Sequence, residues 1–464
     1  MTPSKKLLKR KAMIHSEEFN KVVDTRFWQL AVKLQPNEVA DRVATLNSLC
    51  KEINNGTYSP GSPAIIMEQD KGFGIVRHIP VFSVIDYAVY YYCVKKLDPV
   101  LAKKRIPNTY GGWSLGGRIR DLEESEDEYS LDYELSFSYN PRAWAKHYGE
   151  FNSKLYKQLL KYKKLKGYRA VEFDLANYYD SVRLDILERK IRADSDFQET
   201  EVLNLLFYFL NYRDRRLSNY SPQHVGLPQD AIGDCSRLLA NYYIQDYDQF
   251  MFDLLKENNG NYFRFADDQY IFCKEQDINK VLQTASRKLF EIGLNINQLK
   301  VKSWNLDDLI VYRSFDIFDI LSNPEEGDLK EKINEFAEKT FAISKPQELK
   351  QRGYPLLKRL LTFDFNLLKP DLRAQLVGKV INKEFTHTSR GYTMTNIYKR
   401  LKKDERKDYL DFLKDCSEAY LHNAFHYELV AFAQRANLSA VKKMAILRIL
   451  QLNKERGEVS VPGK

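Results

Sequence analysis

The sequence lacks the features that would place this chain in a membrane, in a disulfide-stabilised scaffold or around zinc. It has no uncharged apolar run of about 18 residues, the length that a membrane-spanning helix needs. Its five cysteines are scattered, their number is odd and no CxxC pair occurs, so neither disulfides nor a cysteine-bound zinc are expected. The seven histidines show no HExxH-type spacing. A bound metal should therefore be held through oxygen.

The start of the chain, MTPSKKLLKRKAM, is basic but has no long apolar core and no small-residue cleavage site. We therefore expect a cytoplasmic protein with no membrane partner. Hydrophobic residues make up 44% of the chain and charged residues 29%, which is typical of a globular fold. A length of 464 residues exceeds one ordinary hydrophobic core and predicts two or three domains.

Charge is unevenly distributed along the chain, whose net charge is +9. Residues 121–134 carry eight acidic and no basic side chains, which predicts a surface loop away from nucleic acid. Residues 154–169 carry seven Lys or Arg, and a second basic run covers 399–407. Either run could bind phosphates or form an ordinary solvated helix face. The first run predicts a shared helical face for Lys157, Lys161 and Lys164.

Hydrophobic periodicity divides the chain into three parts. Residues 1–60 are predicted to be helical. Residues 61–325 alternate strands with helices, which predicts an α+β region with a hairpin turning at Lys71-Gly72 and a long helix over 232–250. Residues 326–464 show helical periodicity throughout, which predicts an all-α carboxyl-terminal region.

Acidic side chains follow two of the predicted strands. Asp174 ends the strand GYRAVEFDL, and Asp267 and Asp268 lie where two short strands meet in YFRFADDQYIFC. Asp-Asp pairs are common in exposed turns, but here each carboxylate abuts an apolar strand, where an uncompensated charge is costly. A divalent cation would compensate it, and oxygen ligands favour Mg²⁺ or Mn²⁺. Two such ions suit in-line phosphoryl transfer.

Five segments together resemble reverse transcriptases. FDLANYYD resembles their motif A, GLPQ followed by SRLLANYY motif B, FADD motif C and GLNINQLK motif D, while GFGIVRHIPVFSVIDYAVYYY resembles their fingers. The resemblance covers about residues 70–302. It implies a right-hand polymerase fold, with fingers and an antiparallel palm sheet in 61–325 and an α-helical thumb in 326–464. NTYGGW (108–113) and SRLLAN resemble the prokaryotic enzymes of antiphage defence and abortive infection.

The resemblance implies roles for single residues. Asp174 and Asp267 would ligate two Mg²⁺ ions, with Mn²⁺ as an alternative, and Asp268 would lie near the primer end. Tyr179 would be the steric gate that selects dNTPs over NTPs. The other nucleotide contacts would be Arg77 on the triphosphate, Gln229 on the nucleotide or template base, and Lys300 as proton donor to pyrophosphate.

Each role has an ordinary structural alternative. Tyr179 could belong to the core, Arg77 could pair with an acid and Gln229 could cap a helix. Lys302 competes with Lys300 for the motif D role, and Asp180 fits a helix N-cap better than a third metal ligand.

One position departs from the family pattern, because Asp230 follows Gln229 where the family usually has Gly. Its carboxylate could cap the next helix or alter template handling. Three hypotheses follow: an RNA-directed DNA polymerase of phage defence that copies a noncoding RNA, a template-independent or protein-primed DNA polymerase, and an inactive palm that binds RNA as a scaffold. The expected partners are dNTPs and RNA or DNA, and self-association stays open.

Overall fold

The computed structural model describes residues 14–455, apart from 36–40, 73–74, 103–105, 113–114, 116–117, 122–128, 133–138, 140–142, 195–199, 215–220 and 322–327. The chain forms two compact units. The first comprises Met1–Ile65 and Pro80–Trp304, and the second comprises Ile66–Ile79 and Asn305–Lys464. The hairpin that lies early in the sequence thus belongs with the carboxyl-terminal helices. The division into three domains remains a prediction.

The first unit begins with helices, as expected. Their bounds are α1 Ser16–Val22, α2 Thr25–Lys33, α3 Arg42–Asn55 and α4 Val84–Leu101. The predicted N-cap of α4 is confirmed, since the Ser83 hydroxyl accepts a hydrogen bond from the backbone N–H of Asp86 at 3.1 Å. Helix α4 is buried on nearly every side and contributes four tyrosines to the core, Tyr87, Tyr90, Tyr91 and Tyr92.

A five-stranded sheet forms the centre of the first unit, in the order β3-β7-β8-β6-β9. Its strands are β3 Thr109–Tyr110, β6 Tyr168–Phe173, β7 Asn261–Phe265, β8 Asp268–Lys274 and β9 Lys302–Trp304. All neighbours are antiparallel except β3, which runs parallel to β7. The predicted antiparallel palm sheet is confirmed. In β8, alternate side chains face opposite ways, as the strand period requires, with Phe272 stacking on Tyr162 and Gln269 bonded to Tyr247.

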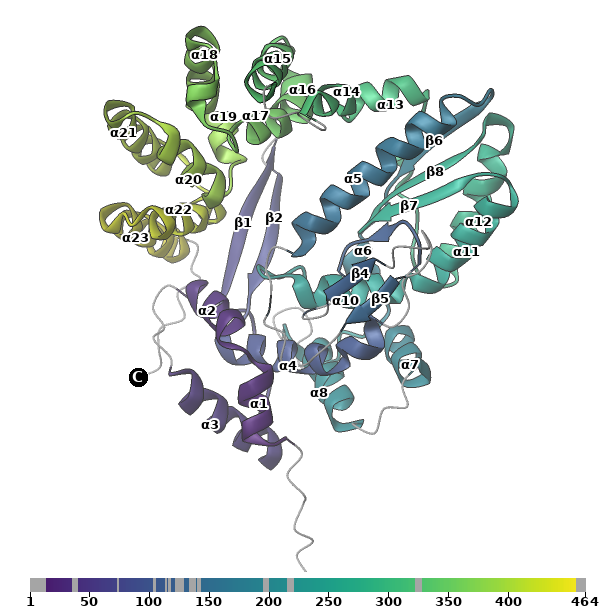
Figure 1. Cartoon of the computed structure of the whole chain (residues 1–464). Helices are drawn as coiled ribbons and strands as arrows, with labels where there is room; N and C mark the ends of the chain where they lie inside the picture. Colours follow the sequence, from purple (N-terminus) through teal and green to yellow (C-terminus); the bar gives the residue numbers. More distant parts are fainter. Residues whose placement is uncertain are drawn as a thin grey trace, which may run out of the picture. The chain divides into compact units, whose positions relative to one another are not determined.

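Helices cover both faces of this sheet, with α5 along one side and α11 and α12 along the other (Figure 1). The remaining elements of the unit are α5 Ala143–Tyr162, α6 Tyr178–Ser181, α7 Leu184–Asp194, α8 Thr200–Tyr212, α10 Asp234–Tyr243, α11 Gln245–Glu257, α12 Ile278–Phe290, β4 Arg118–Asp121 and β5 Tyr129–Asp132.

Four local predictions for this unit are wrong. The helix expected over 232–250 is two helices, α10 and α11, because ψ of −3° at Ile244 departs from the α-helical value. Asp180 lies inside α6 and does not cap α7. Lys164 lies beyond the end of α5, so it cannot share the helical face of Lys157 and Lys161. The acidic run is not only a loop, since β5 pairs with β4; its residues 122–128 and 133–134 lie outside the described residues.

The second unit joins a β-hairpin to a helical array. The hairpin strands are β1 Ile65–Gly72 and β2 Ile75–Val81, so Lys71 and Gly72 belong to a strand and the turn predicted at these residues is wrong. The helices are α13 Leu306–Tyr312, α14 Phe315–Phe318, α15 Leu329–Phe341, α16 Pro346–Glu348, α17 Tyr354–Leu360, α18 Pro370–Val380, α19 Lys383–His387, α20 Gly391–Arg400, α21 Lys403–Ala419, α22 Asn423–Ala436 and α23 Ser439–Glu455.

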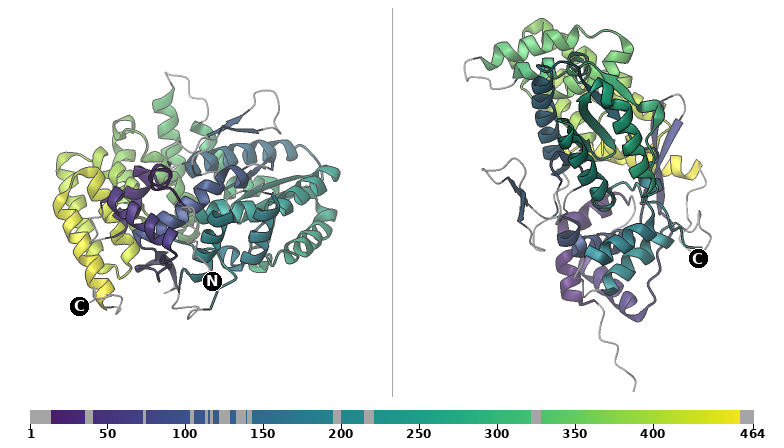
Figure 2. Two further views of the ribbon diagram at one scale, coloured as in Figure 1. Left: turned by 90° about the horizontal axis from the view of Figure 1, so that it is seen from below. Right: turned by 90° about the vertical axis from the view of Figure 1, so that its right-hand side faces the viewer.

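The helices of the second unit pack around one apolar core, and α22 packs against both α20 and α23 (Figure 2). Asn423 ties the hairpin to this array: its amide accepts from the N–H of Glu68 at 2.7 Å and donates to the carbonyl of Ile66 at 3.1 Å. The predicted all-α carboxyl-terminal region is confirmed.

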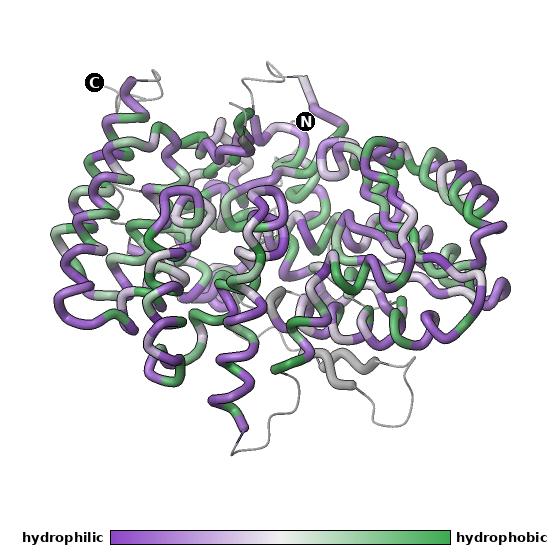
Figure 3. Tube along the Cα trace, turned by 90° about the horizontal axis from the view of Figure 1, so that it is seen from above, coloured by the Kyte–Doolittle hydropathy of each residue, from purple (hydrophilic) through white to green (hydrophobic). Residues whose placement is uncertain are grey.

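Hydrophobic and hydrophilic residues alternate along the helices, as amphipathic helices require (Figure 3). Among the helices of the described residues, none combines the length and apolarity needed to cross a membrane. All five cysteines are buried as free thiols, as the absence of a pairing pattern predicted.

Candidate active site

Strand register brings the three candidate carboxylates to one end of the sheet. Strands β6 and β8 pair up to Phe173 and Gln269, so Asp174 continues β6 where Asp268 begins β8. Asp267 lies in the two-residue turn between β7 and β8, next to the closing pair of Phe265 and Asp268. Residues 93 positions apart in the sequence therefore meet because the sheet is antiparallel.

The carboxylates of this cluster act on one another electrostatically. Burial raises the pKa of Asp267 to about 7, with further contributions from the nearby carboxylates of Asp268 and Asp174. The side chain of Asp174 is only 7% exposed and forms an ion pair through Oδ2 with Nζ of Lys300. No donor of the described residues reaches the buried Oδ1 of Asp174.

This arrangement fits a magnesium site that is completed by substrate. No three His, Cys, Asp or Glu side chains in the described part of the chain are arranged to hold a metal by themselves. Mg²⁺ commonly binds through one or two carboxylates together with substrate phosphates and water. Asp174 has a buried acceptor oxygen without a donor, and burial together with the neighbouring carboxylates disfavours the ionised form of Asp267, so these two residues would hold such an ion.

Tyr179 lies beside the carboxylate cluster. Burial raises the pKa of its hydroxyl above the ordinary value; the nearby Arg237 lowers it and the carboxylate of Asp267 raises it. The phenol therefore stays neutral. Gln229 contacts the segment that contains Tyr179, since its Nε2 lies 3.5 Å from Oδ2 of Asp180, the residue that follows Tyr179.

The segment that resembles motif D packs directly against the segment that resembles motif A. The N–H of Asn297 donates to the carbonyl of Asp174 at 2.7 Å, and the N–H of Ala176 donates to the carbonyl of Asn295 at 2.9 Å. These bonds bring Lys300 to Asp174, and the ion pair raises the pKa of Lys300. Lys302 lies instead in β9, with its Nζ 5.6 Å from the centre of the Trp304 ring. Between the two candidates, the geometry favours Lys300.

Asp230 completes a turn. It is buried, and its Oδ1 accepts hydrogen bonds from the N–H groups of Ile232 and Gly233, both at 2.9 Å, immediately before α10 begins at Asp234. Burial raises its pKa to about 6, while these two bonds lower it. The carboxylate that stands where reverse transcriptases usually have Gly thus orders the turn that precedes α10.

The remaining candidate residues are exposed. Lys157, Lys161 and Lys164 are exposed at the end of α5 and in the turn after it. Arg77 is an exposed residue of β2 and belongs to the second unit, so its role at the triphosphate stays a prediction.

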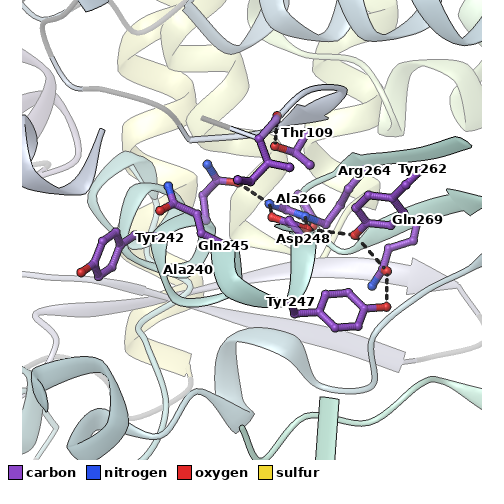
Figure 4. A network of polar contacts seen from close by, with 12 residues as sticks. Thr109, Ala240, Tyr242, Gln245, Tyr247, Asp248, Tyr262, Arg264, Ala266 and Gln269 are labelled. Carbon is purple, nitrogen blue, oxygen red and sulfur yellow. Dashed lines mark hydrogen bonds and ion pairs between the residues drawn. The ribbon is translucent and has the colours of Figure 1, made fainter. Parts of the chain in front are cut away.

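Sequence reasoning missed a buried polar network behind the carboxylate turn (Figure 4). Arg264 is fully buried in β7 and pairs with Asp248 of α11, whose side chain is also fully buried. Arg264 also donates to Oδ1 of Asn241 at 2.8 Å and to the carbonyl of Ala266 at 2.8 Å. The signal in the sequence was an arginine at an inward position of the apolar strand NYFRF, because such a charge needs a buried partner.

The NTYGGW segment supports the same turn from another side. The carbonyl of Tyr110 accepts a hydrogen bond from the N–H of Ala266 at 3.0 Å. Gly112 packs against the backbone of Arg237 so closely that an added Cβ would lie 2.4 Å from it, which only glycine permits. Trp113 lies outside the described residues.

One family of known proteins matches the part of the chain that contains this candidate site. Residues 134–350, slightly less than half of the chain, match the family described as reverse transcriptase (RNA-dependent DNA polymerase), and this range contains all three carboxylates and Lys300. No curated protein matches the sequence.

Solved telomerase structures show only a distant similarity. Telomerase from Candida albicans in complex with a TWJ fragment of telomeric RNA has 11% identity and a TM-score of 0.29, covering 91% of this chain and 77% of that one. Apo telomerase from Candida tropicalis has 9% identity and a TM-score of 0.29, covering 94% and 84%.

The palm sheet and the family match agree with each other. Residues 134–350 match reverse transcriptases, and the sheet that carries the three carboxylates has the palm-type strand arrangement, which supports an RNA-directed DNA polymerase, a nucleotidyltransferase.

Proposed function

We propose that this chain extends a primer with dNTPs by two-metal phosphoryl transfer at Asp174, Asp267 and Asp268. The observation that carries the proposal is the convergence of these carboxylates at one sheet end, where their mutual repulsion raises the pKa of Asp267 further than burial alone. Asp174 and Asp267 would hold two Mg²⁺ ions, or Mn²⁺, which when bound supply electrophilic activation and charge neutralisation for the reacting oxygens.

The surrounding residues would orient and discriminate the nucleotide. Tyr179, neutral and beside Asp267, would block the space of a ribose 2′-hydroxyl. Lys300 is positively charged and would donate a proton from Nζ to the leaving pyrophosphate once it releases Asp174. Gln229 would contact the incoming nucleotide or the template base. Arg77 would bind the triphosphate, to which a guanidinium is geometrically suited.

Exposed lysines near the end of α5 would contact the nucleic-acid backbone. Lys157, Lys161 and Lys164 lie on the surface, where binding to phosphates would release counterions from the nucleic acid. Replacing all three by glutamine should weaken binding of RNA–DNA duplex equally for different sequences. The slope of log affinity against log salt should fall by about one for each phosphate that the variant no longer neutralises. An unchanged slope would remove these lysines from the path.

The biological setting is a further part of the proposal. We assign the chain to prokaryotic antiphage defence, in the cytoplasm, with a noncoding RNA as template; the support is the resemblance of NTYGGW and SRLLAN to defence enzymes. Phage plating on cells that express the wild type or Asp267→Asn would test it. Equal plating on both, with both proteins expressed, would contradict a defence role for the synthesis.

Two other functions rest on the same palm. Template-independent or protein-primed synthesis was suggested by Asp230. The bonds from its Oδ1 to the turn before α10 favour a structural role for this carboxylate and so support the templated reaction. An inactive RNA-binding scaffold would have no need for three converging carboxylates, which are costly to hold together without a cation.

One assay separates the three functions. Purified protein is incubated with Mg²⁺, labelled dNTPs and a primer, with and without an RNA template, beside Asp267→Asn as control. Template-dependent extension that the variant lacks supports the proposal. Extension without template, or label that stays on denatured protein, supports the second function. Tight RNA binding without any incorporation supports the scaffold.

A further inference from the structure

We propose that Arg264 is a positioning residue for the polymerase reaction: anchored on Asp248, its guanidinium holds the turn that presents Asp267. This inference rests on the proposed function of the carboxylate cluster. It adds that hydrogen bonds from a buried arginine keep the carboxylates in place.

The anchor is a fully buried ion pair between β7 and α11. Nε of Arg264 donates to Oδ1 of Asp248 at 2.7 Å, and Nη2 donates to Oδ2 at 2.5 Å (Figure 4). Nη2 also donates to Oδ1 of Asn241 in α10 at 2.8 Å. Buried ion pairs of this kind are seldom required for stability, since well-packed apolar residues often replace them without loss. A role in fixing the positions of the surrounding groups therefore explains this ion pair better than a role in stability does.

The remaining donor of the guanidinium binds the turn itself. Nη1 of Arg264 donates to the carbonyl of Ala266 at 2.8 Å, and this carbonyl belongs to the peptide bond that leads into Asp267. Ala266 has φ of +55°, a conformation that a residue with a side chain adopts rarely and keeps only when its surroundings enforce it. On the other side, the N–H of Ala266 donates to the carbonyl of Tyr110.

Both polar groups of one strained residue are thus fixed, each by a different element. The turn must also resist electrostatic repulsion, because Asp267 lies close to the carboxylates of Asp174 and Asp268. A turn free to relax its backbone would rotate Asp267 away from the other two. The Arg264 bond prevents this relaxation, so the carboxylates stay together before substrate arrives.

Two variants separate positioning from folding. Arg264→Lys keeps a positive charge for Asp248, but a single ammonium cannot span Asp248 and the Ala266 carbonyl as a guanidinium fork does. The double variant Arg264→Met with Asp248→Leu removes both buried charges and the turn bond together, so it leaves no unpaired charge in the core. Arg192→Met is the control, because Arg192 pairs with Glu188 within α7 and lies outside both basic runs.

Two measurements report on the turn. In primer extension, both test variants should lose about 10- to 100-fold in kcat, the range typical of residues that orient metal ligands, with little change in KM for dNTP. In hydrogen exchange, the peptide covering 262–270 should lose protection in both variants without metal or substrate. Arg192→Met should match the wild type in both measurements.

Each outcome decides the proposal. Folded variants with wild-type kcat, or with unchanged exchange of the 262–270 peptide, would overturn it. A uniform loss of protection over the whole unit would show a structural role only and would also overturn it. If the wild type synthesises no DNA, the proposed function fails, and the exchange measurement still tests whether Arg264 holds the turn.

Discussion

Removing one charge from the carboxylate cluster should stabilise the protein while it abolishes synthesis. Burial and the neighbouring carboxylates raise the pKa of Asp267 from its ordinary 3.8 to about 7. The folded state therefore binds this proton more tightly than the unfolded state, so stability is greatest below pH 4 and is lost as pH rises through 7. The difference corresponds to at most roughly 4 kcal/mol at pH 8.5. Asp267→Asn removes that loss.

Thermal unfolding in EDTA at pH 5 and pH 8.5 measures this effect. At about 2 °C for each kcal/mol in a unit of this size, Asp267→Asn should melt up to roughly 8 °C above the wild type at pH 8.5, with a smaller difference at pH 5. Added Mg²⁺ should stabilise the wild type more than the variant. The control is Glu257→Gln, an exposed carboxylate of α11. A variant that melts below the wild type at pH 8.5 without metal would refute the crowded-carboxylate reasoning.

Three further results are expected. Lys300→Ala should slow nucleotide incorporation about 10-fold or more, because it removes the candidate proton donor. Lys302→Ala is the control and should change the rate little. Equal rates for the two variants in single-turnover extension would contradict the assignment of Lys300. Tyr179→Ala should admit NTPs, and unchanged sugar selectivity in competition with dNTPs would exclude the gate. At pH 4, where its raised pKa costs no stability, Asp230→Gly should destabilise the first unit by about 1–2 kcal/mol, because the two hydrogen bonds that order the turn before α10 are removed. Asp230→Asn should remove the decline in stability between pH 4 and 6 that the raised pKa predicts, and melting temperature against pH measures both effects.

The local pattern of the sequence was sufficient for the palm strands. Alternation in GYRAVEF and in YFRF and YIFC predicted β6, β7 and β8, and a pair of aspartates at a strand junction predicted the turn. The meeting of Asp174 with Asp267 followed from one assumption, that these strands are neighbours in a sheet. These strands were predicted correctly because their alternating apolar residues are the ones that the fold buries.

Other features depended on tertiary context that one sequence does not display. The break at Ile244 carries no Gly or Pro, so periodicity ran through it and predicted one helix. The hairpin turn was placed at Lys71-Gly72 on turn propensity, although both residues extend β1. Asp230 was recognised as unusual, but only the structure shows its two bonds to the backbone of residues 232 and 233.

The Arg264 network shows the same limit most clearly. An arginine within an apolar strand signals a buried partner, but Asp248, Asn241 and the Ala266 carbonyl come from three different elements. Their convergence depends on the packing of α10 and α11 behind the sheet. Local propensity does not encode such packing.

The central claim is that two aspartates at one sheet end bind the same divalent ions. Crystals of the wild type grown with Mn²⁺ and a dNTP, measured for anomalous scattering, test it directly. The account predicts Mn²⁺ peaks within ligand distance, about 2.2 Å, of carboxylate oxygens from both Asp174 and Asp267. Peaks that contact neither aspartate, or only one while the other carboxylate points away, would contradict it.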